Sequence, residues 1–519
     1  MKQFPWHVLV FAIYPILYLL TANLQYVEMD EIYLPILISI GGTGLILLLS
    51  RPITGSWLKA GLLTSLVVVL FYNYGLYQNS CKGIVLPLWF NGVRMDHNFY
   101  KYSSLILLVL VVWRMRKAKG KLIKLTSTVN LVALVLLGMT LFNLVSFQIK
   151  NSAEEVELPD DDLPSVPLAE VRPTIYYLIM DAYTRSDILQ EYFDFDNSEF
   201  LNFLRDEGFY VADSAISNYG QTVLSIPSSM NMQYMDSVIS VLGEKNGDRW
   251  PMFKVLNNSK VLKMLKRQQY KSMAFDASMF EVVYLSKADE FHETAGTKLS
   301  LFHNLLINST AIRAFNRRKN INTLSQEDFH RKKILEAFNM MEKIPQKKQP
   351  YYVHGHVLAP HQPFLFLKDG SPRDMGPDYG YNIWSPMVPG QHKGWYIDGY
   401  TQQLQFVNSK LIHLIKKIKS DSKRPYVIII QGDHGTASEL RNHEGFKNND
   451  FRERFSILNA YYFHDQDYSK LYPGISPVNS FKVVMNKYFG TKYQLEEDRA
   501  YFSDWTHPYE LYDVTDSIR

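Results

Sequence analysis

Acidic and imidazole side chains follow two short apolar runs that are typical of buried strands. Asp181 comes directly after the run Ile175–Met180 (IYYLIM). Asp433 and His434 follow the run Tyr426–Ile430 (YVIII) after one Gln-Gly step. In open α/β sheets function gathers at the carboxyl ends of the strands, so we expect these three side chains to meet there. Carboxylate oxygens and an imidazole nitrogen suit a divalent metal ion such as zinc or manganese. The simpler alternative is that each Asp caps the following helix and the histidine is a bystander.

Three histidines cluster in the segment YVHGHVLAPHQPF. If this segment is a strand, the spacing of two residues puts His354 and His356 on one face. Two interpretations remain open. The three histidines complete a second metal site, or His361 and His356 donate hydrogen bonds to a bound anion. Four other basic residues are weaker candidates for anion ligands: Arg185, Arg441, His443 and Arg454.

Taken together, these motifs resemble the sulfatase and lipoteichoic acid synthase families of the alkaline phosphatase superfamily. IYYLIMDAY is similar to their first strand, whose terminal acid binds the metal, and QGDHG is similar to their second metal-binding motif. APHQPF resembles the segment that contacts phosphate or sulfate, and PYELYDVT resembles the closing strand. The motifs follow the order of the family from Pro173 to the end of the chain. The resemblance implies metal binding by Asp181, Asp433 and His434, and anion binding by His361.

The superfamily places a nucleophile after the first metal-binding acid. When the segment NYGQTVLSIPSSMNMQY is aligned to the synthase pattern without a gap, Thr222 falls on the nucleophilic threonine, and Asn231 and Tyr234 also match. A threonine hydroxyl is a poor nucleophile at neutral pH, but a metal can stabilise its alkoxide, as zinc lowers the pKa of bound water from 15.7 to about 7. The resemblance therefore implies that Thr222 is both the nucleophile and a metal ligand. The alternative is a hydroxyl in the first turn of a helix.

One departure from the sulfatase pattern concerns the formylglycine that true sulfatases make from a Cys or Ser in a CxPSR-like motif. The sequence SIPS that begins at Ser225 echoes that motif, but Ser229 stands where the arginine belongs. The single cysteine, Cys81, lies in the apolar N-terminal region, so it cannot serve. It also excludes an intramolecular disulfide and a cysteine-based zinc cluster. A formylglycine at Ser225 is therefore disfavoured.

Five apolar stretches precede residue 150: His7–Ala22, Ile32–Ser50, Trp57–Tyr77, Phe99–Trp113 and Thr128–Phe147. A membrane span needs about 20 apolar residues, or roughly 17 at the short end. The fourth stretch is short and carries Lys101, which could reach the interface by snorkelling. Because four apolar stretches follow the first, a cleaved signal peptide is disfavoured. The sequence predicts an all-α transmembrane anchor of about five helices in residues 1–150.

Charge asymmetry predicts the orientation of this anchor. Six basic residues crowd residues 114–124 before the fifth stretch, and basic loops alternate with poorer ones, as the positive-inside rule requires if the N-terminus is cytoplasmic. An odd number of spans then exports everything after Phe147. The basic cluster as a nucleic-acid patch is disfavoured, because it lies between two apolar spans and the net charge of the chain is only +4. We expect a multi-pass membrane protein with an extracytoplasmic catalytic domain and no nucleic-acid partner.

Residues 151–173 are acidic and contain prolines 159, 164 and 167, which is typical of a stiffened linker. Residues 174–519 change to a globular pattern, in which strands alternate with helical stretches such as Phe329–Met341 and Tyr400–Lys419. This pattern predicts an α/β domain with a mainly parallel central sheet, and the resemblance implies that it is a sulfatase-like catalytic domain.

Three functions are compatible with these features. The anchor and domain together resemble lipoteichoic acid synthases and lipid A phosphoethanolamine transferases. That resemblance favours a transferase that moves a phosphorylated head group from a membrane lipid to an envelope glycan or lipid through Thr222. A hydrolase of phosphate or sulfate esters would use the same residues with water as acceptor. A catalytically inactive ectodomain that binds or scaffolds is disfavoured, because all four expected positions carry competent residues: Asp181, Thr222, Asp433 and His434.

Overall fold

The chain folds into two compact units, one of residues 1–153 with 297–323 and the other of residues 154–296 with 324–519. This computed structural model describes residues 4–24, 29–81, 85–86, 93–118, 122–153, 163–277, 285–293, 301–313, 326–374, 393–438 and 450–518. Residues 297–323 belong in sequence to the predicted catalytic domain, yet they group with the first unit.

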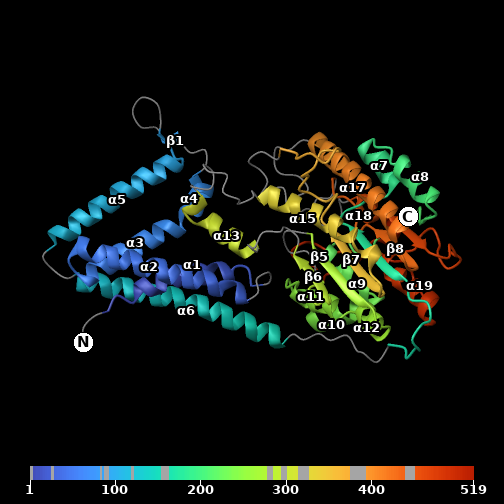
Figure 1. The fold of residues 1–519 in the computed structure, drawn as a ribbon, viewed down its shortest axis with the longest axis horizontal. Helices are drawn as coiled ribbons and strands as arrows, with labels where there is room; N and C mark the ends of the chain where they lie inside the picture. The colour runs from blue at the N-terminus through green and yellow to red at the C-terminus, as the bar shows by residue number, and fades with distance from the viewer. Residues whose placement is uncertain are drawn as a thin grey trace. The chain divides into compact units, whose positions relative to one another are not determined.

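The first unit is built from helices (Figure 1). They are α1 (His7–Thr21), α2 (Tyr33–Thr54), α3 (Trp57–Tyr72), α4 (Tyr74–Cys81), α5 (His97–Lys117), α6 (Ile123–Ala153) and α13 (Leu301–Ser309), with a 3-10 turn Met29–Ile32 and the short pair β1 (Val85–Leu86) and β2 (Val93–Arg94). Each of the five apolar stretches contains a helix. The third stretch is interrupted at Asn73, whose side-chain amide donates to Val69 O at 2.8 Å where α3 ends.

Two helical segments are long and apolar enough to cross a membrane by length and composition, α2 and residues Ile123–Phe147 of α6. Helices α1 and α3 are apolar but shorter. Large apolar side chains stay exposed on the two long helices, with Leu37 at 67% and Phe142 at 71%. A helical N-terminal region before an α/β domain is therefore confirmed, whereas the five-span bundle stays a prediction.

The second unit is organised around a seven-stranded sheet of order β4-β9-β8-β3-β7-β5-β6. Its strands are β3 (Thr174–Met180), β4 (Tyr210–Val211), β5 (Lys271–Asp276), β6 (Glu290–Glu293), β7 (Tyr351–Val357), β8 (Tyr426–Gln431) and β9 (Asn459–Phe463). The five strands from β8 to β6 pair in parallel, and β9 pairs antiparallel with both β8 and β4. The central strand β3 pairs with β7 on one side and β8 on the other, so the carboxyl ends of all three lie at one edge.

Helices cover both faces of this sheet, as the mainly parallel pairing requires. The helices of the second unit are α7 (Ser186–Phe193), α8 (Ser198–Asp206), α9 (Thr222–Asn231), α10 (Asp236–Leu242), α11 (Trp250–Asn257), α12 (Lys260–Arg267), α15 (Gln326–Met341), α17 (Lys393–Asp421), α18 (Phe451–Phe455), α19 (Pro477–Phe489) and α20 (Thr515–Ile518), with a 3-10 turn Ile344–Gln346 and the pair β10 (Tyr501–Phe502) and β11 (Tyr512–Asp513).

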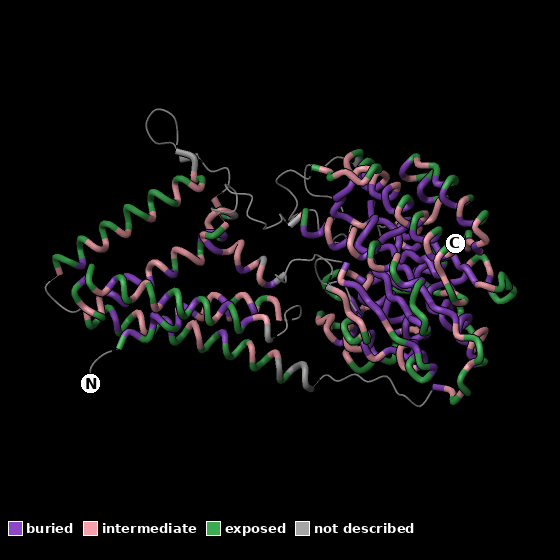
Figure 2. The backbone as a smooth tube through the Cα atoms, viewed as in Figure 1, coloured by how far each residue is buried: buried purple, intermediate pink, exposed green. Residues whose placement is uncertain are grey.

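Strand β3 shows why its sequence is apolar throughout. Tyr176, Leu178 and Met180 pack into the core on one face, with side chains of α8, α15 and α17. Ile175, Tyr177 and Ile179 pack into the core on the other face, with side chains of α9, α12 and α19. Buried backbone is concentrated in this interior (Figure 2). A fully apolar strand therefore marks the centre of the sheet, and the first polar residue after it marks the edge.

Candidate metal centre and active site

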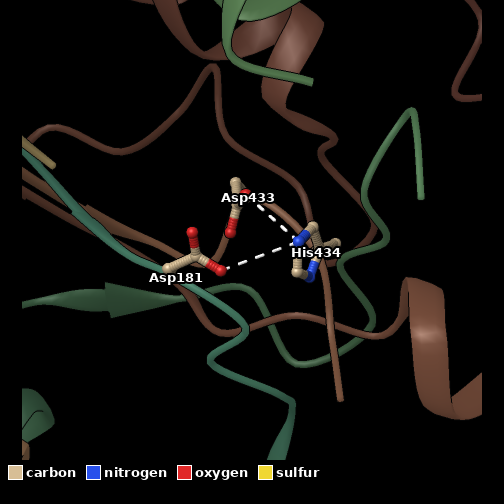
Figure 3. A group of neighbouring side chains, drawn as sticks. All are labelled: Asp181, Asp433 and His434. Atoms are coloured by element: carbon tan, nitrogen blue, oxygen red, sulfur yellow. Dashed lines mark ion pairs between the residues drawn. The ribbon is translucent and has the colours of Figure 1, made fainter. Parts of the chain in front are cut away.

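Asp181, Asp433 and His434 converge where β3 and β8 end (Figure 3). One ligand atom from each side chain lies within 4.8 Å of the others. The Nε2 atom of His434 lies 3.6 Å from Asp181 Oδ1 and 3.4 Å from Asp433 Oδ2. All three residues are at most 2% exposed. The parallel pairing of β3 with β8 thus brings together residues that are some 250 positions apart in the sequence.

The donor set fits a divalent metal ion. Asp181 Oδ1 and Asp433 Oδ2 are buried without a hydrogen-bond partner among the described residues, and these are the two oxygens that face His434. The other oxygen of each carboxylate is held: Ala182 N donates to Asp433 Oδ1 at 3.1 Å, and His356 Nε2 lies 3.2 Å from Asp181 Oδ2. Buried unpaired carboxylate oxygens are costly, and a shared cation would satisfy both.

The electrostatics of the carboxylate pair point the same way. Burial, and then the charge of Asp181, raise the pKa of Asp433 to about 6. Burial also acts to raise the pKa of Asp181, but the neighbouring His361, His356 and His434 outweigh it and hold that pKa below its usual range. Burial lowers the pKa of His434 and keeps its imidazole neutral. Its Nδ1 atom lies 2.9 Å from Gly435 O, so Nδ1 carries the proton and Nε2 offers its lone pair to a metal.

Thr222 and Ser225 both lie close to this centre but differ in exposure. Thr222 is the first residue of α9 and is half-buried, and its Oγ1 atom lies 3.2 Å from His434 Nε2. Ser225 is 1% exposed, and its hydroxyl donates to Asp433 O at 2.7 Å. The Thr222 hydroxyl is therefore the fourth potential ligand atom of this centre, after one atom each of Asp181, Asp433 and His434. The Ser225 hydroxyl is instead hydrogen-bonded to the backbone carbonyl of Asp433.

The predicted anion-binding histidines take different positions. His356, on β7, contacts Asp181. His361 follows β7 and is half-buried, and its ring centroid lies 6.1 Å from that of His434. The backbone N–H of His361 donates to Asp181 O at 2.9 Å, which fixes this segment beside the end of β3. His354 packs instead among aromatic rings, with its Nδ1 atom 3.0 Å from the Tyr352 hydroxyl. Two of the three histidines thus lie beside the carboxylates.

The candidate arginines also differ in their partners. Arg185 forms an ion pair with Asp187 at 2.6 Å and donates to Ala215 O. Arg454, on α18, donates to two backbone carbonyls in the loops that carry Thr222 and His434. Arg441 and His443 lie outside the described residues.

Several residues that hold the loop after β8 were not predicted. A Cβ atom on Gly432 would clash with Tyr183 O, and one on Gly435 would clash with Glu453 O, so both positions exclude side chains. Glu453 is 1% exposed and accepts from Thr436 Oγ1 at 2.6 Å and from Ser438 N at 2.8 Å. The glycines of QGDHG were a usable signal of close backbone approach. Glu453 stands in the charged sequence FRERF, which gives no sign of burial.

No protein-family model matches the chain. No curated protein matches it either. Solved structures that match the chain include the C-terminal periplasmic domain of EcEptC from Escherichia coli in complex with Zn, with 14% identity and a TM-score of 0.43, covering 68% of this chain and 96% of that one. Another is the integral membrane lipooligosaccharide phosphoethanolamine transferase A from Neisseria meningitidis, with 10% identity and a TM-score of 0.40, covering 93% of this chain and 95% of that one. A third is a 2-O GAG sulfatase, with 11% identity and a TM-score of 0.39, covering 64% of this chain and 73% of that one.

These structures are phosphoethanolamine transferases and sulfatases, which are among the families that the motifs resemble.

Proposed function

We propose that the chain is a membrane-anchored, metal-dependent phosphotransferase that acts through a covalent intermediate on Thr222. The observation that carries the proposal is the convergence of a half-buried hydroxyl with two unpaired, buried carboxylate oxygens around His434 Nε2. Asp181, Asp433, His434 and Thr222 would hold a divalent ion, zinc or manganese. When bound, such an ion supplies positive charge that favours an ionised hydroxyl and neutralises a phosphate or sulfate ester.

The chemistry of the residues then follows in two displacements. Thr222 Oγ1 loses its proton and forms a bond to phosphorus, while the bond from phosphorus to the leaving alcohol breaks and the leaving oxygen takes up a proton. This step gives a phosphothreonine ester. His361 and His356 lie beside the carboxylates, where they can donate hydrogen bonds to the anionic group. An acceptor hydroxyl then attacks the same phosphorus and releases Thr222, while the acceptor loses its proton and the threonine regains one.

The donor that we propose is a membrane lipid with a phosphorylated head group, and the acceptor is an envelope glycan or lipid. The apolar helices α2 and α6 support a membrane location, because a bilayer would present such a donor to the same protein. The predicted multi-pass anchor with an extracytoplasmic catalytic unit belongs to this proposal. A hydrolase of phosphate or sulfate esters is the alternative, and it needs only water in place of the acceptor.

The test uses the full-length protein in vesicles that contain phosphatidylethanolamine or phosphatidylglycerol. We expect metal-dependent release of diacylglycerol and a peptide containing Thr222 that gains the mass of the whole phosphorylated head group. A protein that ignores lipids but cleaves p-nitrophenyl phosphate or sulfate would be the hydrolase. A protein that binds metal but does neither would be a binding or scaffolding ectodomain, and the proposal would be wrong.

A further inference from the structure

Arg454 joins the two loops that carry the proposed nucleophile and the metal-binding histidine. Its Nε atom donates to Gly220 O at 2.7 Å, two residues before Thr222. Its Nη1 atom donates to Gly435 O at 3.2 Å, directly after His434. Two backbone hydrogen bonds therefore fix the guanidinium group beside the candidate centre.

No carboxylate of the described residues is paired directly with this arginine. Arg454 is half-buried, and no carboxylate oxygen of the described residues lies within 4.0 Å of its guanidinium group. A guanidinium group has five N–H bonds, and the three that remain have no acceptor among the described residues. Burial lowers the pKa of Arg454, while the charges of Asp433 and Asp181 act to raise it, and a guanidinium stays protonated at neutral pH.

Arg452, two residues away on the same helix α18, provides the contrast. Its Nη2 atom pairs with Glu191 Oε2 at 3.0 Å, and the Arg452 side chain is 40% exposed. The more exposed Arg452 is thus paired with a carboxylate, whereas Arg454 has N–H donors without an acceptor among the described residues. A half-buried cation with spare donors between two loops of an active site is the arrangement that binds an anion.

We propose that Arg454 is a phosphate-binding residue whose remaining guanidinium N–H groups contact the non-bridging oxygens of the phosphoryl group that reacts with Thr222. This inference rests on the proposed function. Because the guanidinium is already fixed by Gly220 O and Gly435 O, little side-chain entropy is lost when the anion binds. The same contacts strengthen as charge builds up on the phosphoryl oxygens in the transition state.

The test compares Arg454→Ala with the matched control Arg452→Ala in the full-length, metal-loaded protein. We expect Arg454→Ala to weaken competitive inhibition by inorganic phosphate about tenfold or more, and to lower kcat/KM on p-nitrophenyl phosphate roughly 10²-fold. Metal content should not change, guanidinium ion in solution should restore part of the rate, and Arg452→Ala should behave as the wild type.

Unchanged phosphate inhibition in Arg454→Ala would overturn the proposal, and so would a loss of metal without guanidinium rescue, because that result assigns only a loop-positioning role. If Arg454→Ala does not fold, Arg454→Lys provides the test. Lysine keeps the positive charge but lacks the planar, multidentate guanidinium group, so inhibition by phosphate must weaken. A wild-type protein that neither binds phosphate nor turns over an ester would instead refute the proposed function itself.

A second, independent observation concerns α13, whose sequence lies between β6 and α15 of the catalytic unit but which packs in the first unit. Phe302 and Leu306 are four residues apart, so they share one helix face. They are 1% and 8% exposed and belong to the same apolar cluster. The other buried members of that cluster come from the N-terminal region: Ile16, Leu20 and Ile32.

The contact between α13 and α4 is made by backbone atoms at close range. A Cβ atom on Gly75 would lie 2.6 Å from Asn308 O and 2.7 Å from Ser309 Cα, so only glycine fits there. Just beyond the helix, Ala311 N donates to Phe71 O at 2.9 Å. The apolar face of α13, its close backbone contact at Gly75 and the backbone hydrogen bond from Ala311 together hold α13 in the first unit.

We propose that α13 is a second membrane attachment of the catalytic unit, separate from the acidic linker. The chain passes between the two units three times, after residues 153, 296 and 323, so the catalytic unit is joined to the first unit by α13 as well as by the linker. Cutting the linker alone should therefore not release it.

The test inserts a protease site into residues 154–162 of the full-length protein in membranes. After cleavage and a high-salt wash, the wild-type catalytic fragment should stay in the membrane pellet. Phe302→Asp combined with Leu306→Asp should release it, and so should Gly75→Leu, which leaves the fragment itself unaltered. The control Ile312→Asp, at a side chain that is 42% exposed, should not. Release of the wild-type fragment, or retention of both docking variants, would refute the proposal.

Discussion

Replacing Thr222 by Ala and, separately, Ser225 by Ala asks which hydroxyl attacks the substrate. The two hydroxyls lie one helical turn apart on α9, so proximity does not decide between them. Their environments do. The Thr222 hydroxyl is half-buried and lies 3.2 Å from His434 Nε2, whereas the Ser225 hydroxyl is 1% exposed and donates to Asp433 O.

The expected magnitudes follow from these environments. Loss of the covalent nucleophile should lower the rate on p-nitrophenyl phosphate by about 10³-fold or more, which corresponds to roughly 4 kcal/mol of barrier. Three potential metal ligands remain in Thr222→Ala, so metal should still bind. Ser225→Ala removes one buried hydrogen bond, worth about 1 kcal/mol of stability, and should lower the rate by roughly tenfold at most. Thr222→Ser keeps a hydroxyl and should retain most activity.

Initial rates of the three variants, with metal content measured on the same samples, provide the assay. Peptide mapping of protein quenched during turnover then locates the covalent adduct. A larger rate loss in Ser225→Ala than in Thr222→Ala would show that the nucleophile is misassigned. An adduct on Ser225 would show the same thing directly.

The remaining predictions concern the metal, pH and topology. Asp433→Asn should weaken metal affinity by about tenfold or more, measured by metal content after dialysis. The control Asp213→Asn, at an exposed carboxylate, should keep its metal, and an equal loss of metal from both variants would refute the site. Burial lowers the pKa of His354 to about 3, so the folded state resists a proton that the unfolded state accepts below about pH 6.5. The contribution of His354 to the free energy of unfolding should thus be full above that pH and fall as pH drops toward 3, with a loss of about 2 kcal/mol at pH 5. In urea unfolding, His354→Gln should reduce the pH dependence of this free energy by that amount. Parallel curves of unfolding free energy against pH for the wild type and the variant would contradict the prediction. A membrane-impermeant maleimide should label Cys81 in intact spheroplasts, and labelling only after permeabilisation would overturn the predicted orientation.

The core of the catalytic fold could be predicted because its strands are buried on both faces. The run IYYLIM became β3 and the run YVIII became β8, and the expected helices at Phe329–Met341 and Tyr400–Lys419 lie within α15 and α17. Such runs carry their own signal, since a strand between two helical layers must be apolar throughout. The third apolar stretch was less simple, because its break at Asn73 depends on a local cap and not on hydropathy.

The parts that the sequence indicated weakly or not at all are those set by contacts between distant residues. Arg454 was only one of four weak candidates for an anion ligand, because its hydrogen bonds to the carbonyls of Gly220 and Gly435 join segments that are far apart in the sequence. The helix α13 has an apolar face like that of many core helices, and only its partners reveal that it packs with the first unit. His354 shares a strand with His356, but its ring is turned among Tyr177 and Tyr352 and not toward the carboxylates.

The position of Asp181 and Asp433 would couple the folding of this unit to the binding of the proposed metal ion. Stability alone does not explain these aspartates, because each is buried with an oxygen that has no hydrogen-bond partner among the described residues, and the charge of Asp181 raises the pKa of Asp433. Two apolar residues at these strand ends would give a more stable sheet edge. We propose that a cation offsets this repulsion, and the neutral His434 would complete its donor set. A ligand that binds the folded state alone stabilises it by mass action, so the same ion that would activate Thr222 would also hold the carboxyl ends of β3 and β8 together.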